Sequence, residues 1–93
     1  GYGVVEDLCG HGIGTHLHED PEIPNFRQLR RGIKLRPGMT LAIEPMINMG
    51  TWKVFVDADD PYGWEVITED EMPSAQWEHT LLMTDHGVEV LTY

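Results

Sequence analysis

The sequence is poor in cysteine, in basic residues and in long apolar runs. Its 93 residues include one cysteine, Cys9, so no internal disulfide can form, which favours a reducing compartment and a cytoplasmic location. Acidic residues outnumber basic residues 16 to 6, and the net charge of −10 argues against an extended nucleic-acid interface. No apolar run approaches the roughly 20 residues of a membrane-spanning helix. We therefore expect neither nucleic acid nor a membrane among the partners.

The sequence also lacks the apolar spacing of an amphipathic helix, and proline and glycine divide it into strand-length pieces. "MTLAIEPMINM" is apolar for nearly its whole length, and we expect one strand there. "WKVFV" and "WEVIT" flank "DADDPYG", and "AQWEHTLLMT" and "VEVLTY" flank "DHG", which predicts two hairpins. "EDPEIPNFRQLRRGIKLRPG" is predicted to be a long irregular connection. The chain alone is predicted to be mostly antiparallel β.

Two acidic residues stand in strand-like apolar surroundings, Glu44 in "LAIEPMI" and Glu78 in "WEHTLLM". A buried carboxylate is unfavourable unless something compensates its charge, so each acid either faces solvent on a half-exposed sheet or has a partner. His11, between two glycines in "CGHGIG", is a third candidate ligand. A divalent cation offsets several buried negative charges at once, and carboxylates with an imidazole suit Zn, Mn, Fe or Co. These residues therefore predict a metal site.

Four segments in order resemble the C-terminal motifs of type I methionine aminopeptidases: "CGHGIGTHLHEDPEIPN", "LRPGMTLAIEPMIN", "YGWEVIT" and "SAQWEHTLLMTDHGVEVLT". The resemblance runs from about Gly1 to Thr92. It implies the α+β pita-bread fold of the creatinase and aminopeptidase group, in which two pseudo-symmetric halves enclose a pair of metal ions. Residues 1–93 would then be the mostly antiparallel-β C-terminal portion of a single metallopeptidase catalytic domain whose N-terminal half is absent.

The resemblance also implies a role for each candidate site residue. His11 and Glu44 would hold one of two divalent metal ions (Co, Mn, Fe or Zn), and Glu78 would bridge both. Glu44 would also carry a proton from the attacking water to the leaving amine, and His18 would hydrogen-bond the scissile amide. The remaining ligands would be two aspartates of the missing half. The wall around the substrate's methionine side chain would include Trp64, Leu17 and Cys9.

The implied function is a metalloaminopeptidase that removes the initiator methionine from nascent proteins, acting on peptides with an N-terminal methionine. We expect the isolated chain to be inactive, because it supplies only three of the five expected ligands. Position 17 is commonly aromatic in the family and is leucine here, which reshapes the expected methionine pocket. Two alternatives remain open: an aminopeptidase or prolidase of the same fold that cleaves before proline, and a non-catalytic binding module that keeps the fold.

Overall fold

The computed structural model describes residues 1–93, and the chain is built of strands without any helix. All neighbouring strands are antiparallel. A five-stranded sheet has the order β10 (Gly87–Val90), β9 (His79–Thr84), β4 (Thr40–Ile43), β2 (Gly10–Gly12) and β3 (Glu19–Ile23). A three-stranded sheet has the order β1 (Gly3–Val4), β5 (Met46–Asn48) and β8 (Ser74–Gln76). The third sheet pairs β6 (Val54–Val56) with β7 (Val66–Thr68). The mostly antiparallel prediction is confirmed.

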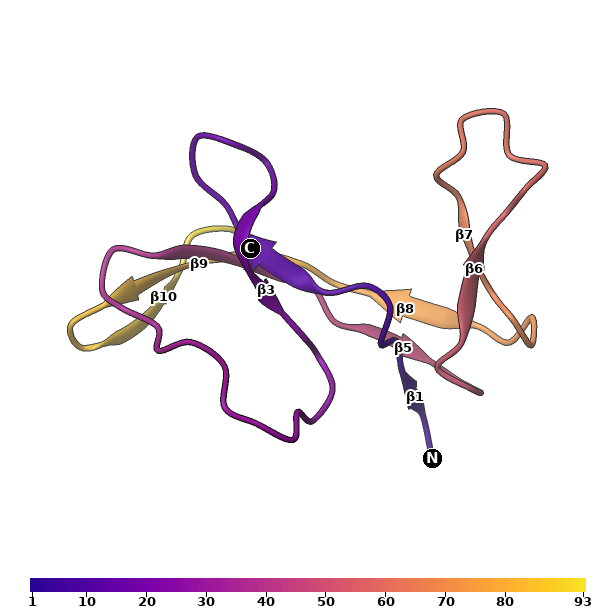
Figure 1. Cartoon of the computed structure of the whole chain (residues 1–93), viewed down its shortest axis with the longest axis horizontal. Helices are drawn as coiled ribbons and strands as arrows, with labels where there is room; N and C mark the ends of the chain where they lie inside the picture. The colour runs from indigo at the N-terminus through magenta and orange to yellow at the C-terminus, as the bar shows by residue number, and fades with distance from the viewer.

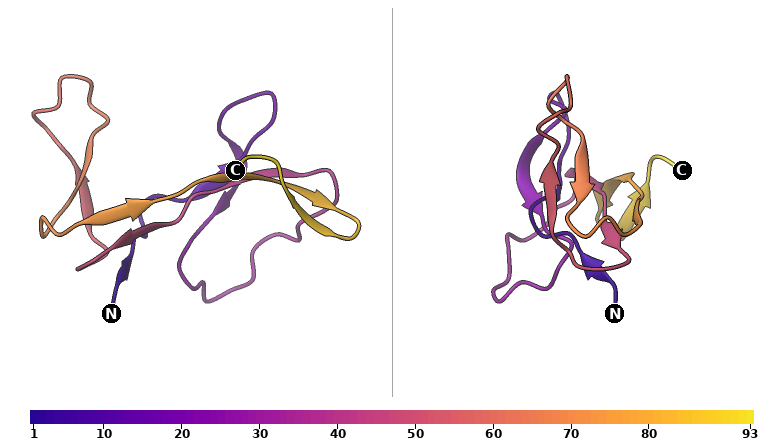
Figure 2. Two further views of the ribbon diagram at one scale, coloured as in Figure 1. Left: turned by 180° about the vertical axis from the view of Figure 1, so that it is seen from behind. Right: turned by 90° about the vertical axis from the view of Figure 1, so that its right-hand side faces the viewer.

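Both predicted hairpins are present. β6 pairs with β7 from Val54 opposite Thr68 to Val56 opposite Val66, and β9 pairs with β10 across the turn at Asp85. In Figure 1 the β6–β7 hairpin stands away from the other strands, on the same side of them as the loop between β2 and β3. Figure 2 shows the same arrangement from behind. These two projections therefore rise from one side of a curved layer of strands.

Three expectations about individual strands were wrong. The apolar stretch expected to be one strand is two, because β4 ends at Ile43 and β5 begins at Met46 in another sheet. Pro45 lies in the gap and has no N–H to donate to a ladder. The stretch "AQWEHTLLMT" is likewise divided into β8 and β9. The segment expected to be irregular begins with β3, whose Pro21 is tolerated because β3 is an edge strand.

The chain has little core of its own. Seven of 93 residues are buried, and the hydrophobic ones among them are Val5, Leu41 and Ala42. The radius of gyration is 14.8 Å, whereas a compact chain of this length has about 12 Å. The structure contains no helix long and apolar enough to cross a lipid bilayer. Most apolar side chains of the sheets therefore remain accessible at the surface.

Candidate metal centre

Glu44 and Glu78 lie in the gap between two ladders of paired strands, where the pairing of β4 with β9 ends and the pairing of β5 with β8 begins. β4 pairs with β9 up to Ile43 opposite His79, and β5 pairs with β8 from Met46 opposite Gln76. Between these ladders lie Glu44 on one side and Glu78 on the other. A backbone hydrogen bond of 3.4 Å from the Trp77 N–H to the Pro45 carbonyl spans the gap. The interruption thus places two carboxylates opposite each other, between the five-stranded and three-stranded sheets.

His11 brings an imidazole to the same place from β2. It is opposite Ala42 of β4, and its residue is only 9% exposed. Its Nε2 lies 3.2 Å from Glu44 Oε2 and 4.0 Å from Glu78 Oε1. One ligand atom from each of the three residues lies within 4.8 Å of the others. The structure therefore brings together the three residues for which a metal site was predicted.

The hydrogen bonding of His11 orients its ring for ligation. Its Nδ1 lies 2.8 Å from the Gly12 carbonyl oxygen, which can only accept, so we assign the proton to Nδ1. In the neutral ring this leaves the lone pair of Nε2 directed toward the two carboxylates. A backbone carbonyl that fixes the tautomer in this way is typical of metal-binding histidines.

The electrostatics of the cluster favour a bound cation. The pKa of Glu44 is raised, first by burial and then by the negative charge of Glu78, while the neighbouring His11 lowers it in part. No lysine or arginine in the chain lies within ion-pair distance of an acid. The nitrogen and oxygen donors match the ligands that zinc, manganese, iron and cobalt accept. The donor set therefore fits a divalent metal ion.

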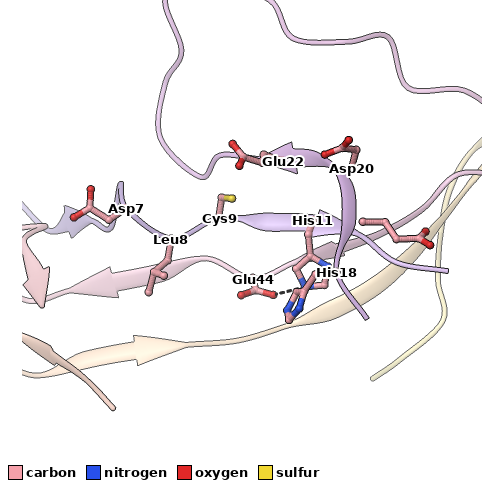
Figure 3. A pocket seen from close by; sticks show the side chains of 9 residues that line it. Asp7, Leu8, Cys9, His11, His18, Asp20, Glu22 and Glu44 are labelled. Atoms are coloured by element: carbon pink, nitrogen blue, oxygen red, sulfur yellow. Dashed lines mark ion pairs between the residues drawn. The ribbon is translucent and has the colours of Figure 1, made fainter. Parts of the chain in front are cut away.

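His18 lies against His11, with ring centroids 4.4 Å apart and ring planes 70° to each other. Both rings, with Glu44, line a polar recess of about 670 Å³ that Figure 3 shows. The recess is also bordered by Cys9 and by several acidic side chains, including Asp20. His16 contacts Glu19 instead, at the surface.

A second recess of about 520 Å³ adjoins the first, because Leu8 and Glu44 line both. Its other walls are mainly apolar and include Trp64, which is 72% exposed. Leu17 lines neither recess and is 69% exposed, so its contact with a substrate stays a prediction. Reasoning from the sequence missed Leu8, and the only signal for it is its place between the apolar run "GVV" and "CGHG".

The glycines around His11 make room for the chain's own backbone. A side chain at Gly10 would overlap the carbonyl of Ala42 in β4. A side chain at Gly12 would overlap the carbonyl of Asp20 in β3. Glycine has no Cβ and permits such close approach. The two glycines therefore allow β2 to pack closely between β3 and β4, which keeps His11 buried.

Comparisons with known proteins show the family of the chain. The profile described as "Metallopeptidase family M24" matches residues 1–85. The chain is 52% identical to the methionine aminopeptidase of Clostridium perfringens over 92 residues, which cover 99% of this chain and 36% of that protein. It is 51% identical to methionine aminopeptidase 1 of Saccharomyces cerevisiae over 89 residues, covering 96% of this chain and 22% of that protein.

Solved structures show the same similarity. The crystal structure of methionine aminopeptidase from Thermotoga maritima superposes with a TM-score of 0.90 at 50% identity, covering 99% of this chain and 36% of that chain. The chain thus spans about a third of the length of the bacterial relatives it matches. The observed strands agree with the β-rich C-terminal portion expected for the pita-bread fold. The chain belongs to metallopeptidase family M24.

Proposed function

We propose that the protein containing this chain is a methionine aminopeptidase, a hydrolase that removes the initiator methionine during the maturation of new proteins in the cytoplasm. Residues 1–93 are, in this proposal, the C-terminal portion of its single catalytic domain. The observation that carries the proposal is the convergence of His11, Glu44 and Glu78 beside an apolar recess. The names of relatives at about 50% identity support it.

In this proposal His11, Glu44 and Glu78 hold divalent metal ions, two in all, with two aspartates supplied by an N-terminal region. When bound, the metal supplies Lewis acidity that polarises the substrate carbonyl and lowers the pKa of water. The fit rests on the donor atoms within 4.8 Å of one another and on the absence of any other cationic partner for the two acids. Cobalt, manganese, iron and zinc all accept these donors.

The chain's own residues bind and orient the peptide around Glu44. Glu44 borders both recesses. Its carboxylate can therefore reach the scissile bond of a peptide that has one side of this bond in each recess. It takes a proton from the attacking water and delivers it to the leaving amine. His18, beside His11 in the polar recess, donates a hydrogen bond to the scissile amide.

The apolar recess accepts the methionine side chain. Trp64 forms one wall, and Val5, Leu8 and Met46 are among the other apolar residues there. A flexible thioether packs well against aliphatic and aromatic groups. Cys9, in the polar recess, contacts the peptide near the scissile bond.

The test is cleavage by the full-length protein loaded with Mn²⁺ or Co²⁺. We expect release of methionine from Met-Ala-Ser, and a loss of at least about 10³-fold in kcat/KM for Glu78→Ala, because a metal ligand is removed. Cleavage of an Xaa-Pro peptide in preference to Met-Ala-Ser would establish the alternative peptidase. Failure to bind metal at all would establish the non-catalytic module.

The isolated 93-residue chain is expected to leave Met-Ala-Ser uncleaved with either metal, because it lacks the N-terminal ligands and catalysis depends on geometry. Turnover by the isolated chain that Glu78→Ala abolishes would contradict this part of the proposal.

A further inference from the structure

In the loop between β6 and β7 the carboxylate of Asp60 accepts three backbone hydrogen bonds, in addition to three backbone–backbone bonds within residues 57–65. Its Oδ1 accepts a hydrogen bond of 3.1 Å from the Tyr62 N–H. Its Oδ2 accepts two bonds of 2.8 Å, from the N–H groups of Trp64 and Glu65. Hydrogen bonds to an ionised acceptor are stronger than those between neutral groups. These bonds lower the pKa of Asp60, with the Glu65 N–H as the largest cause.

The side chain of Trp64 has no hydrogen bond of its own to fix its position. It is 72% exposed, and its indole N–H makes no hydrogen bond in the structure. It nevertheless lines the apolar recess together with Val54 and Val66, the residues of the hairpin strands that flank the loop. The place of the indole ring in that recess therefore follows from the backbone of residue 64, which Asp60 restrains.

We propose that Asp60 is a positioning residue that sets selectivity for the first side chain of the substrate by holding Trp64 at the wall of the apolar recess. This inference rests on the proposed function. Asp60 acts through the tryptophan and contacts neither substrate nor metal ligands.

The neighbouring residue provides a matched control. Asp59 carries the same charge in the same loop, but its carboxylate accepts no hydrogen bond, and only its backbone N–H is engaged, with Asp57. Asp59→Asn therefore changes the loop's charge by the same amount as Asp60→Asn and leaves the restraint on Trp64 intact.

The experiment compares steady-state cleavage of methionyl and alanyl peptides by the full-length protein and its variants. In Asp60→Asn an amide replaces one accepting oxygen with a donor, so the three N–H groups can no longer all be satisfied. We expect KM for the methionyl peptide to rise about tenfold with kcat nearly unchanged, because the lost contact stabilises ground state and transition state alike. The ratio of kcat/KM for the methionyl peptide to that for the alanyl peptide falls by a similar factor in Asp60→Asn. In Asp59→Asn, KM and this ratio stay within about twofold of wild type.

Two further variants separate positioning from general damage to the fold. Asp60→Ser has one accepting oxygen, as Asp60→Asn does, but on a shorter side chain, so its KM should rise at least as much as that of Asp60→Asn. Adding Asp60→Asn to Trp64→Ala should cause no additional rise in KM, since Asp60 acts through the indole ring. Faster amide exchange at residues 64 and 65 in Asp60→Asn reports the released loop without any reference to activity.

Several results would overturn the inference. Asp60→Asn and Asp59→Asn with the same kinetics would do so and leave the proposed function standing. An equal rise in KM from Asp60→Asn with and without Trp64 would also overturn it, as would unchanged selectivity in Asp60→Ser if Asp60→Asn fails to fold. Wild-type protein that cleaves no methionyl peptide would overturn the proposed function and, with it, this inference.

Discussion

At the scale of single residues, the chemistry is concentrated in His11, Glu44 and Glu78. Glu44 and Glu78 are acidic residues within apolar, strand-like segments. This contrast with their neighbours makes both detectable from the sequence. The sequence does not show how close they come, because that depends on two strand pairs being interrupted at the same level. The sequence also does not show which ring nitrogen of His11 is free to bind a metal, because that depends on the hydrogen bond between Nδ1 and the Gly12 carbonyl.

Removing one carboxylate should weaken metal binding sharply. For Glu78→Gln we expect the Kd for Mn²⁺ or Co²⁺ to rise by at least about tenfold, because even residues that only orient ligands change affinity by 10–100-fold. Isothermal titration calorimetry of the full-length protein measures this. Glu89→Gln, which removes an exposed acid of β10 from the same sheet, should leave Kd unchanged. Equal effects of the two substitutions would show that the metal binds elsewhere.

The close packing of β2 gives a second prediction. Gly10→Ala places a methyl group against the Ala42 carbonyl within the five-stranded sheet, so we expect a loss of about 1–3 kcal/mol in the free energy of unfolding. Gly32→Ala is the control, since nothing lies within 4 Å of an added Cβ there, and its effect should stay within about 0.5 kcal/mol. Urea unfolding measures the free energy of unfolding of both variants. A Gly10→Ala variant as stable as Gly32→Ala would contradict the packing described for β2.

At the scale of elements, turn chemistry predicted both hairpins, because acidic, proline and glycine residues mark the reversals plainly. The interruptions at Glu44 and Glu78 could not be read from apolar content, since "LAIEPMI" is apolar on both sides of the gap. Pro45 was the available signal, because a proline within an apolar run argues against a continuous central strand. β3 was missed because its proline and acids resemble a loop, although an edge strand accommodates both.

The base of the β6–β7 hairpin is tied by Asp70, whose carboxylate accepts hydrogen bonds of 2.8 Å from the Thr51 N–H and 3.1 Å from the Met72 N–H. These bonds lower its pKa below the ordinary value of 3.8, with the Thr51 bond the largest cause. A lowered pKa in the folded state stabilises the fold fully above 3.8, and this contribution disappears as the pH falls through the lowered pKa.

We therefore expect Asp70→Asn to be less stable than wild type at neutral pH, with the difference shrinking as the pH falls below 3.8. Urea unfolding over a pH series measures the difference. Asp85→Asn, in a turn where the carboxylate accepts no hydrogen bond, should change stability little at any pH. A difference between wild type and Asp70→Asn that stays constant with pH would contradict the assigned role.

At the scale of the whole molecule, the chain is an open layer of strands with few buried residues. The positions of proline and glycine and the two hairpin patterns predicted the antiparallel architecture. The small core could not be predicted in this way, because it reflects sheet faces that no other part of the chain covers. Apolar side chains such as Leu35, Phe55 and Trp77 are exposed. This agrees with a chain that spans about a third of its bacterial relatives.

The exposed apolar surface predicts how the isolated chain behaves. We expect residues 1–93 produced alone to self-associate, because large uncovered apolar patches drive aggregation. Size-exclusion chromatography with light scattering reports this, and the full-length protein is the control, expected to elute without such aggregates. A stable, cooperatively folded monomer of the isolated chain would contradict it.

The position of a bound metal ion would test directly whether His11, Glu44 and Glu78 are ligands. A crystal of the full-length protein soaked with Co²⁺ or Mn²⁺, measured at the absorption edge of that metal, locates the ion by its anomalous scattering. We expect an anomalous peak about 2.0–2.2 Å from His11 Nε2 and from carboxylate oxygens of Glu44 and Glu78. A metal-loaded crystal with no peak between these three side chains, or with its peaks elsewhere, would contradict this expectation.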